Sequence, residues 1–273
     1  MALTVEDILK GLEALAPLAM AESWDCPGLA LGDPHREVTS ILLALDVTPQ
    51  VIEEAKNLGV QLILVHHPFF FRPVQEITSR EPKGRMIQDL IQAQIAVLSA
   101  HTNLDAAPGG MNDEIMALLG LPQWTLLPWK EYPSIGRLAV IEPTPLEGLA
   151  QSIGAALDTP ALRRVGPKDQ RIQRLAVVNG SGMDYLKDCV NAKADCLLTG
   201  DVTHHAAQDA LDLGICIIDA GHFCTEWMVF TRLMERMLGP YQAKEPALKV
   251  WKAKTAKDPF QYQSIQRKPE KEH

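Results

Sequence analysis

Short apolar runs recur along the chain, and several of them end abruptly in polar side chains. Runs of about four consecutive residues rich in Ile, Leu and Val are typical of strands buried on both faces of a sheet. They predict strands at 40–45, 62–65, 95–98, 174–178, 196–199 and 215–218. Helical periodicity predicts helices from Thr4 toward Pro17, from Pro49 to Leu58 and from Met183 to Ala192. Because strands and helices alternate, the pattern favours a parallel α/β layout.

The second half of the chain repeats the plan of the first at lower fidelity. Ile63 aligns with Leu197 at an offset of 134 positions, and Ile95 aligns with Ile215 at an offset of 120. The two offsets agree if the loop after His67 is longer in the first half. We therefore expect an internal duplication that gives two similar α/β halves, with mixed sheets and flanking helices. Chance similarity between two α/β units is the alternative.

Two prolines, Pro128 and Pro133, indicate where the halves meet. The predicted units are a first half at residues 1–128 and a second half at residues 129–263. Within the second half, residues 247–253 predict an edge strand. Residues 264–273 are too polar to pack and are predicted to form a disordered tail.

Composition narrows the class of protein. A hydrophobic content of 47% with 22% charged residues is typical of globular domains, and no apolar stretch approaches the roughly 20 residues that span a bilayer. The acidic N-terminus lacks the features of a signal peptide, so we expect a cytoplasmic protein without a membrane partner. A net charge of −8 without runs of Lys or Arg argues against binding to a nucleic acid backbone. The five cysteines include no C-x-x-C pair, which argues against disulfides or a zinc ribbon.

Histidines and acids gather where three of the apolar runs end. The carboxyl ends of parallel strands meet at one edge of a sheet, where α/β proteins place ligands and chemistry. Imidazole and carboxylate groups are also the usual ligands of divalent transition metals. The residues at these ends are His66, His67, His101, Asp105, His222 and Glu226. The sequence therefore predicts a metal centre.

The spacing within this group adds detail. Adjacent His66 and His67 would point to opposite sides of an extended strand, and a turn at Pro68 would let each serve a different metal. His222 and Glu226 are four positions apart, which places both on one face of a helix that begins there. A carboxylate such as Glu226 can bridge two cations, whereas an imidazole cannot.

Other polar residues fit the pattern less well. His204 and His205 follow the run at 196–199 and match by composition, whereas His35 and His273 are expected on the surface. A His and Asp pair acting as acid and base without any cation is the non-metal alternative. No G-x-S-x-G nucleophile motif or phosphate-binding P-loop is present in the sequence.

Five motifs occur in order between about Glu22 and Gln263. They are Trp24-Asp25-x-x-Gly28-Leu29, His66-His67-Pro68, His101-Thr102-Asn103-Leu104-Asp105 with Pro108-Gly109-Gly110-Met111-Asn112-Asp113, Thr199-Gly200-Asp201-x-x-His204-His205, and Asp219-Ala220-Gly221-His222-x-x-Thr225-Glu226. Together they resemble the Nif-three-like family, whose members are often labelled GTP cyclohydrolase I type 2 homologues. The chain departs from this family at Cys26-Pro27, where Asn usually follows the Trp-Asp pair, and it lacks the inserted domain of some members.

The resemblance implies a dinuclear metal site in the cleft between the halves and a ring-shaped homohexamer built as a trimer of dimers. The implied cofactors are two divalent ions per subunit, zinc, iron or manganese. The implied ligands are His66, His67, Asp105, His222 and the bridging Glu226. His101 is implied as a further ligand or a close neighbour of the ligands, and His204 and His205 as residues of the pocket.

These features lead to one main hypothesis and two alternatives. The main hypothesis is a dinuclear metal-dependent hydrolase that acts on a nucleotide-like or small cyclic substrate. If the family label applies, the reaction opens the guanine ring of GTP, with His101, His204 or His205 relaying protons. The alternatives are a non-catalytic metal-binding regulatory or scaffold protein, and a metal store or chaperone.

Overall fold

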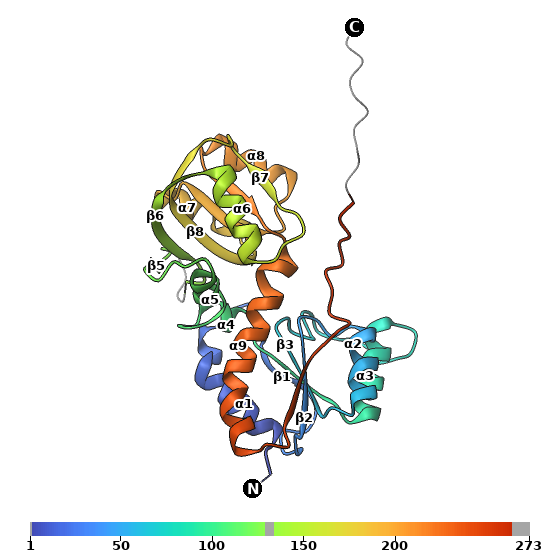
Figure 1. Cartoon of the computed structure of the whole chain (residues 1–273). Helices are drawn as coiled ribbons and strands as arrows, with labels where there is room; N and C mark the ends of the chain where they lie inside the picture. The colour runs from blue at the N-terminus through green and yellow to red at the C-terminus, as the bar shows by residue number, and fades with distance from the viewer. Residues whose placement is uncertain (1, 129–133, 264–273) are drawn as a thin grey trace.

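Two mixed β-sheets, each covered by helices, lie at opposite ends of the molecule (Figure 1). The computed structural model describes residues 2–128 and 134–263. The predicted boundary between the halves and the predicted tail at 264–273 therefore lie outside the described residues. Among the helices of the described ranges, none is long and apolar enough to cross a bilayer.

The first sheet has five strands in the order β1, β4, β3, β2, β11. Their bounds are β1 (Gly28–Leu31), β2 (Ser40–Ala44), β3 (Leu62–Val65), β4 (Ala96–Ser99) and β11 (Lys249–Lys252). Strands β4, β3, β2 and β11 are parallel to one another, and β1 pairs with β4 in the antiparallel sense. The edge strand predicted at 247–253 is β11, and it joins the first sheet although its residues belong to the predicted second half.

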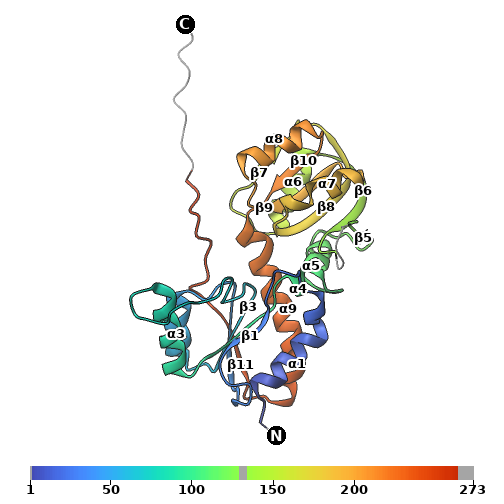
Figure 2. The same ribbon diagram turned by 180° about the vertical axis from the view of Figure 1, so that it is seen from behind.

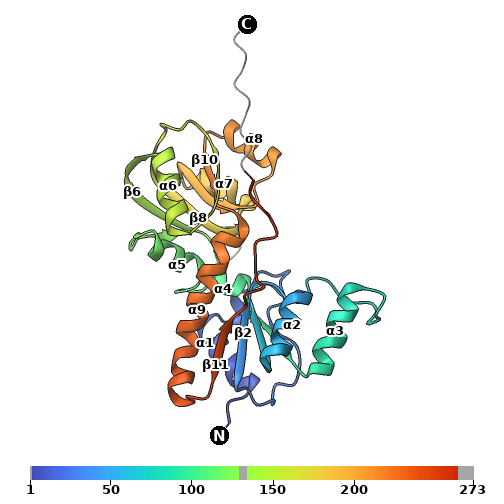
Figure 3. The same cartoon turned by 45° about the vertical axis from the view of Figure 1, so that its right-hand side comes forward.

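Helices cover both faces of this sheet (Figure 3). They are α1 (Val5–Leu15) and α9 (His222–Lys244) on one face, and α2 (Pro49–Leu58) and α3 (Pro82–Ala93) on the other. Side chains of β2 alternate between the faces: Ile41 and Leu43 pack with α1 and α9, whereas Leu42 and Ala44 pack with α2. Every residue of β2 is buried, as the apolar run predicts for a strand covered on both sides.

The second sheet has six strands in the order β5, β6, β8, β9, β10, β7. Their bounds are β5 (Thr125–Leu126), β6 (Arg137–Pro145), β7 (Arg163–Val165), β8 (Arg171–Ser181), β9 (Cys196–Gly200) and β10 (Cys216–Asp219). Strands β8, β9 and β10 are parallel, and the remaining pairs are antiparallel. Helix α6 (Leu146–Ala156) covers one face, and α7 (Leu186–Asn191) and α8 (His204–Asp212) cover the other (Figure 2).

Short helices complete the connections, namely η1 (Leu18–Met20), α4 (Thr102–Ala106), α5 (Met111–Leu118) and η2 (Met183–Tyr185). The helix predicted from Met183 to Ala192 is thus divided between η2 and α7. The predicted strand at 174–178 is longer, since β8 begins at Arg171 and continues through Gly180 and Ser181. Helix α1 begins as predicted, with a reciprocal capping box between Thr4 and Asp7.

Helix α9 joins the two halves. It begins at the second sheet and continues across the face of the first, so its residues Val229, Phe230, Leu233 and Met234 lie in one continuous core (Figure 1). The same core includes Leu43 of β2 and residues of β8 and β10. Because this core is shared, the ends of parallel strands from both sheets face a common space.

Candidate metal centre

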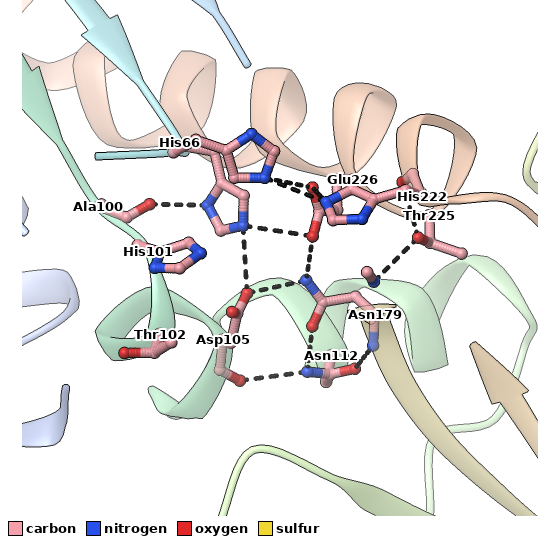
Figure 4. Close-up of polar contacts among 12 residues, drawn as sticks. His66, Ala100, His101, Thr102, Asp105, Asn112, Asn179, His222, Thr225 and Glu226 are labelled. Atoms are coloured by element: carbon pink, nitrogen blue, oxygen red, sulfur yellow. Dashed lines mark hydrogen bonds and ion pairs between the residues drawn. The ribbon is translucent and has the colours of Figure 1, made fainter. Parts of the chain in front are cut away.

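The predicted ligands converge where strands of both sheets end (Figure 4). His66 and His67 follow β3 directly, and Asp105 lies in α4 just after β4. His222 and Glu226 lie one turn apart at the start of α9, which follows β10. All five predicted ligands are therefore brought together from elements far apart in the sequence.

Glu226 lies at the centre of the cluster. Its Oε2 is 3.0 Å from His67 Nε2 and 2.9 Å from His222 Nε2, and its Oε1 is 3.6 Å from His66 Nε2. Asp105 Oδ1 is 3.5 Å from the same atom of His66. The Nε2 atoms of His67 and His222 are only 3.1 Å apart. Nitrogen and oxygen atoms suitable for metal binding thus point toward one small volume.

The other ring nitrogen of each histidine is held by an oxygen atom. The pairs from Nδ1 are His66 with Ala100 O at 2.7 Å, His67 with Asp46 Oδ1 at 2.8 Å, His101 with Asp25 Oδ2 at 2.9 Å, and His222 with Asp201 Oδ2 at 2.7 Å. A carbonyl or carboxylate oxygen only accepts hydrogen bonds, so each Nδ1 carries the proton. A neutral ring held in this way presents its Nε2 lone pair, which is the arrangement that metal-binding histidines show.

Lone pairs that meet without a donor favour a proton or a metal cation between them. Among the described residues, His66 Nε2 and Glu226 Oε2 are buried side-chain atoms without a hydrogen-bond partner. Such atoms are costly in a protein interior unless something positive lies between them. The donor set, imidazole nitrogen with carboxylate oxygen, fits a divalent transition metal.

Two overlapping groups of three residues can each hold an ion. One contains His66, His67 and His101, and the other contains His67, His222 and Glu226, with the ligand atoms of each group within 4.8 Å of one another. His67 belongs to both groups. The described part of the cluster therefore offers candidate sites for metal.

Polar side chains behind the carboxylates fix their positions. Asn179, at the end of β8, donates from Nδ2 to Asp105 Oδ1 at 2.9 Å and to Glu226 Oε1 at 3.3 Å. Asn112 in turn donates to Asn179 Oδ1 at 2.6 Å. Gly180 has a φ of +57°, and a Cβ at this position would collide with Glu226 Oε1. The backbone therefore approaches the carboxylate more closely than any other residue type would permit.

Without a cation, protons would be held tightly here. Burial alone would lower the pKa of His67, but its hydrogen bond with Asp46 and its interaction with the carboxylate of Glu226 raise that pKa to about 11. The pKa of His222 is raised to about 9, because the interactions with Glu226 and Asp201 outweigh burial. Burial favours protonation of Glu226, yet the surrounding histidines hold its pKa well below the usual range. This field of negative charge attracts a proton or a metal cation alike.

Cavities open on two sides of the cluster. One, of about 640 Å³, is lined by His67, His101 and Glu226 together with Trp24 and Phe71. The other, of about 900 Å³, shares Asp46, His67 and His222 with it. The cluster is therefore reachable by small molecules, which distinguishes it from a closed structural metal site.

The predicted catalytic histidines differ in position. The ring of His101 lies 5.3 Å from that of His66 and 5.6 Å from that of His67, between centroids, so it belongs to the cluster. His204 and His205 lie exposed in the first turn of α8 and line neither of the two cavities. Their catalytic role stays a prediction.

Three site residues were missed as candidates in the sequence. Asp46 follows the apolar run that forms β2, and Asn179 follows the run that forms β8. Applying the same rule, a polar residue just after a buried strand, to these two runs would have found both. Asp25 gave a weaker signal, since it lies in a turn before β1 and reaches His101 only through folding.

The sequence comparisons identify relatives of this chain. The family model DUF34/NIF3 (NGG1p interacting factor 3) matches residues 3–259. A Clostridium perfringens protein named GTP cyclohydrolase 1 type 2 homolog is 38% identical over 263 residues, which cover 94% of this chain and 99% of that protein. A second relative with this name, from Lactococcus lactis, is 34% identical over 94% of this chain and 98% of its own length.

Solved structures show the same fold. A hypothetical protein of Staphylococcus aureus superposes with a TM-score of 0.86 at 30% identity, covering 96% of this chain and 100% of the other. HcgD of Methanocaldococcus jannaschii, in its reduced form, superposes with a TM-score of 0.79 at 27% identity and covers 92% of this chain and 97% of its own. These matches confirm the resemblance found in the sequence motifs. The chain belongs to the DUF34/NIF3 family.

Proposed function

We propose that this protein is a metal-dependent hydrolase that uses two divalent cations on a nucleotide-like or small cyclic substrate. The observation that carries the proposal is the convergence of imidazole and carboxylate lone pairs beside an open cavity. The name of its relatives, GTP cyclohydrolase 1 type 2 homolog, belongs to the same reaction class. A site built only for structure would instead be closed by its own ligands.

Five residues would hold the cations, namely His66, His67, Asp105, His222 and Glu226. Glu226 would bridge them, because its Oε1 faces His66 and its Oε2 faces His67 and His222. This mixed set of ligands suits zinc, iron or manganese. When bound, two such cations lower the pKa of water and polarise the bond under attack.

His101 is suited to accept a proton in the cavity. Asp25 accepts the hydrogen bond from its Nδ1, and this leaves the Nε2 lone pair available. Thr102 holds Asp25 in place by donating to the same carboxylate from its backbone N–H, at 3.1 Å, and from Oγ1, at 2.5 Å. His204 and His205 remain proposed proton relays on the sequence resemblance alone.

We also propose that the two halves arose by internal duplication. In each sheet three parallel strands run in chain order, and an earlier strand pairs with the third in the antiparallel sense: β1 with β4, and β7 with β10. Ile63 pairs with Val97 and Leu197 pairs with Ile217, so the offsets between matching residues are 134 and 120. These are the offsets found in the sequence.

The proposed assembly is a homohexamer, a trimer of dimers, which the sequence motifs imply. Sedimentation velocity of the purified protein tests it, and a mass equal to one chain at micromolar concentration would contradict it.

Purified protein with its native metal provides the test of the proposed function. We expect turnover of at least one member of a panel of GTP, nucleosides, cyclic amides and phosphoesters. Asp105→Ala should abolish that turnover, whereas Asp212→Ala, an exposed acid on α8, should leave it unchanged. Equal turnover by Asp105→Ala and the wild type would refute a metal-dependent hydrolase.

A further inference from the structure

Two exposed aromatic side chains line the 640 Å³ cavity next to the metal ligands. Trp24 and Phe71 are each 58% exposed, although large aromatic residues are usually covered. Their ring centroids are 5.9 Å apart with an interplanar angle of 32°. Both rings meet the ring of His101 edge to face, at 5.9 Å from Trp24 and 5.5 Å from Phe71. The three rings therefore form an aromatic corner that borders the ligands.

Hydrogen bonds connect the loops that carry this corner. Trp24 precedes Asp25, which accepts hydrogen bonds from His101 and Thr102. Cys26 donates from Sγ to Phe70 O at 3.0 Å and so connects the Trp24 loop to the loop that carries Phe71. The corner is thus positioned before any ligand arrives, which lowers the entropic cost of binding.

Apart from its histidines, the ionisable side chains with a formal charge in the described lining of this cavity are all acidic. Its described lining includes the carboxylates of Glu22, Asp46, Asp105, Asp184 and Glu226 and includes no Lys or Arg. Two divalent cations would offset most of that charge, but they would leave no positive surplus for a triphosphate chain. Phosphate recognition usually uses Arg, Lys or the N-terminus of a helix.

The neighbouring cavity does not supply the missing positive charge. Arg163 is the single Lys or Arg among its described lining residues, and its guanidinium is already paired with Asp219 and donates to Val202 O at 2.8 Å. Asp201 and Asp258 line the same cavity. A polyphosphate that extended from the metal cluster in either direction would therefore meet carboxylates.

We propose that the substrate of this site is a planar heterocycle without phosphate groups, such as a nucleobase or nucleoside, whose ring stacks on Trp24 and Phe71. The inference rests on the proposed function, since it assigns the substrate class of that hydrolase. Stacking on an aromatic side chain is tolerant of the ring's identity, and the acidic walls select against phosphorylated forms. GTP itself is thereby disfavoured relative to guanosine.

Isothermal titration calorimetry of the metal-loaded protein with guanosine and with GTP tests this inference. Guanosine should bind at least about tenfold more tightly than GTP at moderate ionic strength. Trp24→Ala should weaken guanosine binding by about tenfold, whereas Trp24→Phe, which keeps an aromatic face, should bind within about threefold of the wild type. Circular dichroism and metal content verify that each variant is folded and loaded.

A charge reversal provides the second comparison. Asp184 is exposed and lines the cavity, so Asp184→Lys should raise the affinity for GTP and narrow the gap between the two compounds. Asp212→Lys adds the same charge on α8, outside either cavity, and should leave the gap unchanged. If both substitutions raised the affinity for GTP equally, the effect would come from the net charge of the protein. That result would contradict the proposal that carboxylates of the cavity exclude phosphorylated compounds.

Two results would overturn the inference: no binding of guanosine, or binding of GTP as tight as that of guanosine. Binding that depends on Trp24 but is followed by no hydrolysis would contradict the proposed function and leave the binding of a planar ring intact. Conversely, metal-dependent hydrolysis of a phosphorylated compound that is unaffected by Trp24→Ala would support the hydrolase and refute the substrate class.

Discussion

The two halves share the order of their parallel strands but contribute differently to the cluster. In the first half, β3 ends directly in His66 and His67, and their Nε2 atoms face the centre. In the second half, the matching strand β9 ends near Asp201, which holds His222 from behind. The predicted ligands of that half lie on α9 instead. The equivalent ends of β3 and β9 therefore carry predicted ligands in one half and an orienting group in the other.

The predicted ligands of the two halves also differ in how deeply they are buried. The side chain of His66 is completely buried, whereas that of His222 is 31% exposed. Asp46 lies just beyond β2 and Asn179 lies near the end of the matching strand β8. The first accepts a hydrogen bond from His67, and the second donates to Asp105 and Glu226. The shared edge of the parallel strands thus determines where polar side chains meet. The type of residue at each strand end determines whether that side chain can bind a metal or orient a neighbouring ligand.

Removing the buried Arg137, which connects the two halves, should have the largest effect on the stability of the protein. Arg137 of β6 is buried, is paired with Asp113 of α5 and donates to Ala106 O and Ala107 O, each at 3.2 Å. Because Arg137→Ala leaves these groups unpaired, we expect it to lower the free energy of unfolding by about 3–5 kcal/mol. Urea denaturation measures this change, with exposed Arg72→Ala as the control. A loss below about 1 kcal/mol would mean that the halves do not depend on this contact.

Removing one histidine at a time tests the shared centre. His67 belongs to both candidate groups, so His67→Ala should reduce the content of both metals, and His66→Ala or His222→Ala should mainly reduce one. The affinity of the affected site should fall by more than about 100-fold, since loss of an outer hydrogen bond alone costs 10–100-fold. Elemental analysis after dialysis measures the content, with exposed His35→Ala as the control. Identical losses in all three variants would show that His67 is not shared.

The carboxylates that orient His67 and His222 provide a smaller test of the difference between the halves. Asp46→Asn and Asp201→Asn each weaken the hydrogen bond to an Nδ1, and we expect each to lower metal affinity by about 10–100-fold. Asp46→Asn should have the larger effect, because its partner His67 serves both groups. Competition with a coloured chelator measures the affinities. A larger effect of Asp201→Asn would reverse the assigned order.

The smallest expected effect is a pH-dependent change in the free energy of unfolding, caused by an ion pair between α5 and α9. Burial alone would raise the pKa of Glu114, but hydrogen bonds from Arg232 and Arg236 hold it below the usual value of 4.5. A lowered pKa in the folded state stabilises the protein above the unfolded value, and this contribution is lost as the pH falls below about 4.5. Glu114→Gln should therefore cost about 1 kcal/mol at pH 7, and this cost should shrink as the pH falls below about 4.5. Denaturation at several pH values measures this cost. If it stayed the same at low pH, it would come from altered packing and not from the charge of Glu114.

The apolar runs predicted six buried strands, and the residues just beyond them predicted the ligands. His66, His67, Asp105, His222 and Glu226 meet because strand ends meet, which is a local rule that a sequence can express. Antiparallel strands β6 and β7 were missed because their burial is irregular, and most residues of β6 from Val140 onward are partly or fully exposed. The partners in the hydrogen bonds that Asp25 accepts and Asn179 donates are brought near by the whole fold, so no single segment indicates these contacts.

The position of β11 has a consequence for how the protein is made. Lys249 of β11 pairs with Ser40 of β2, so the edge of the first sheet is completed by residues synthesised 209 positions later. During translation the N-terminal half emerges with the flank of β2 uncovered, and a strand without a neighbour is prone to pair with other chains. Helix α9, which delivers Glu226, also leaves the ribosome late. The candidate site and the first sheet are therefore completed together, so a nascent chain cannot bring the predicted ligands together before its first sheet is close to closure.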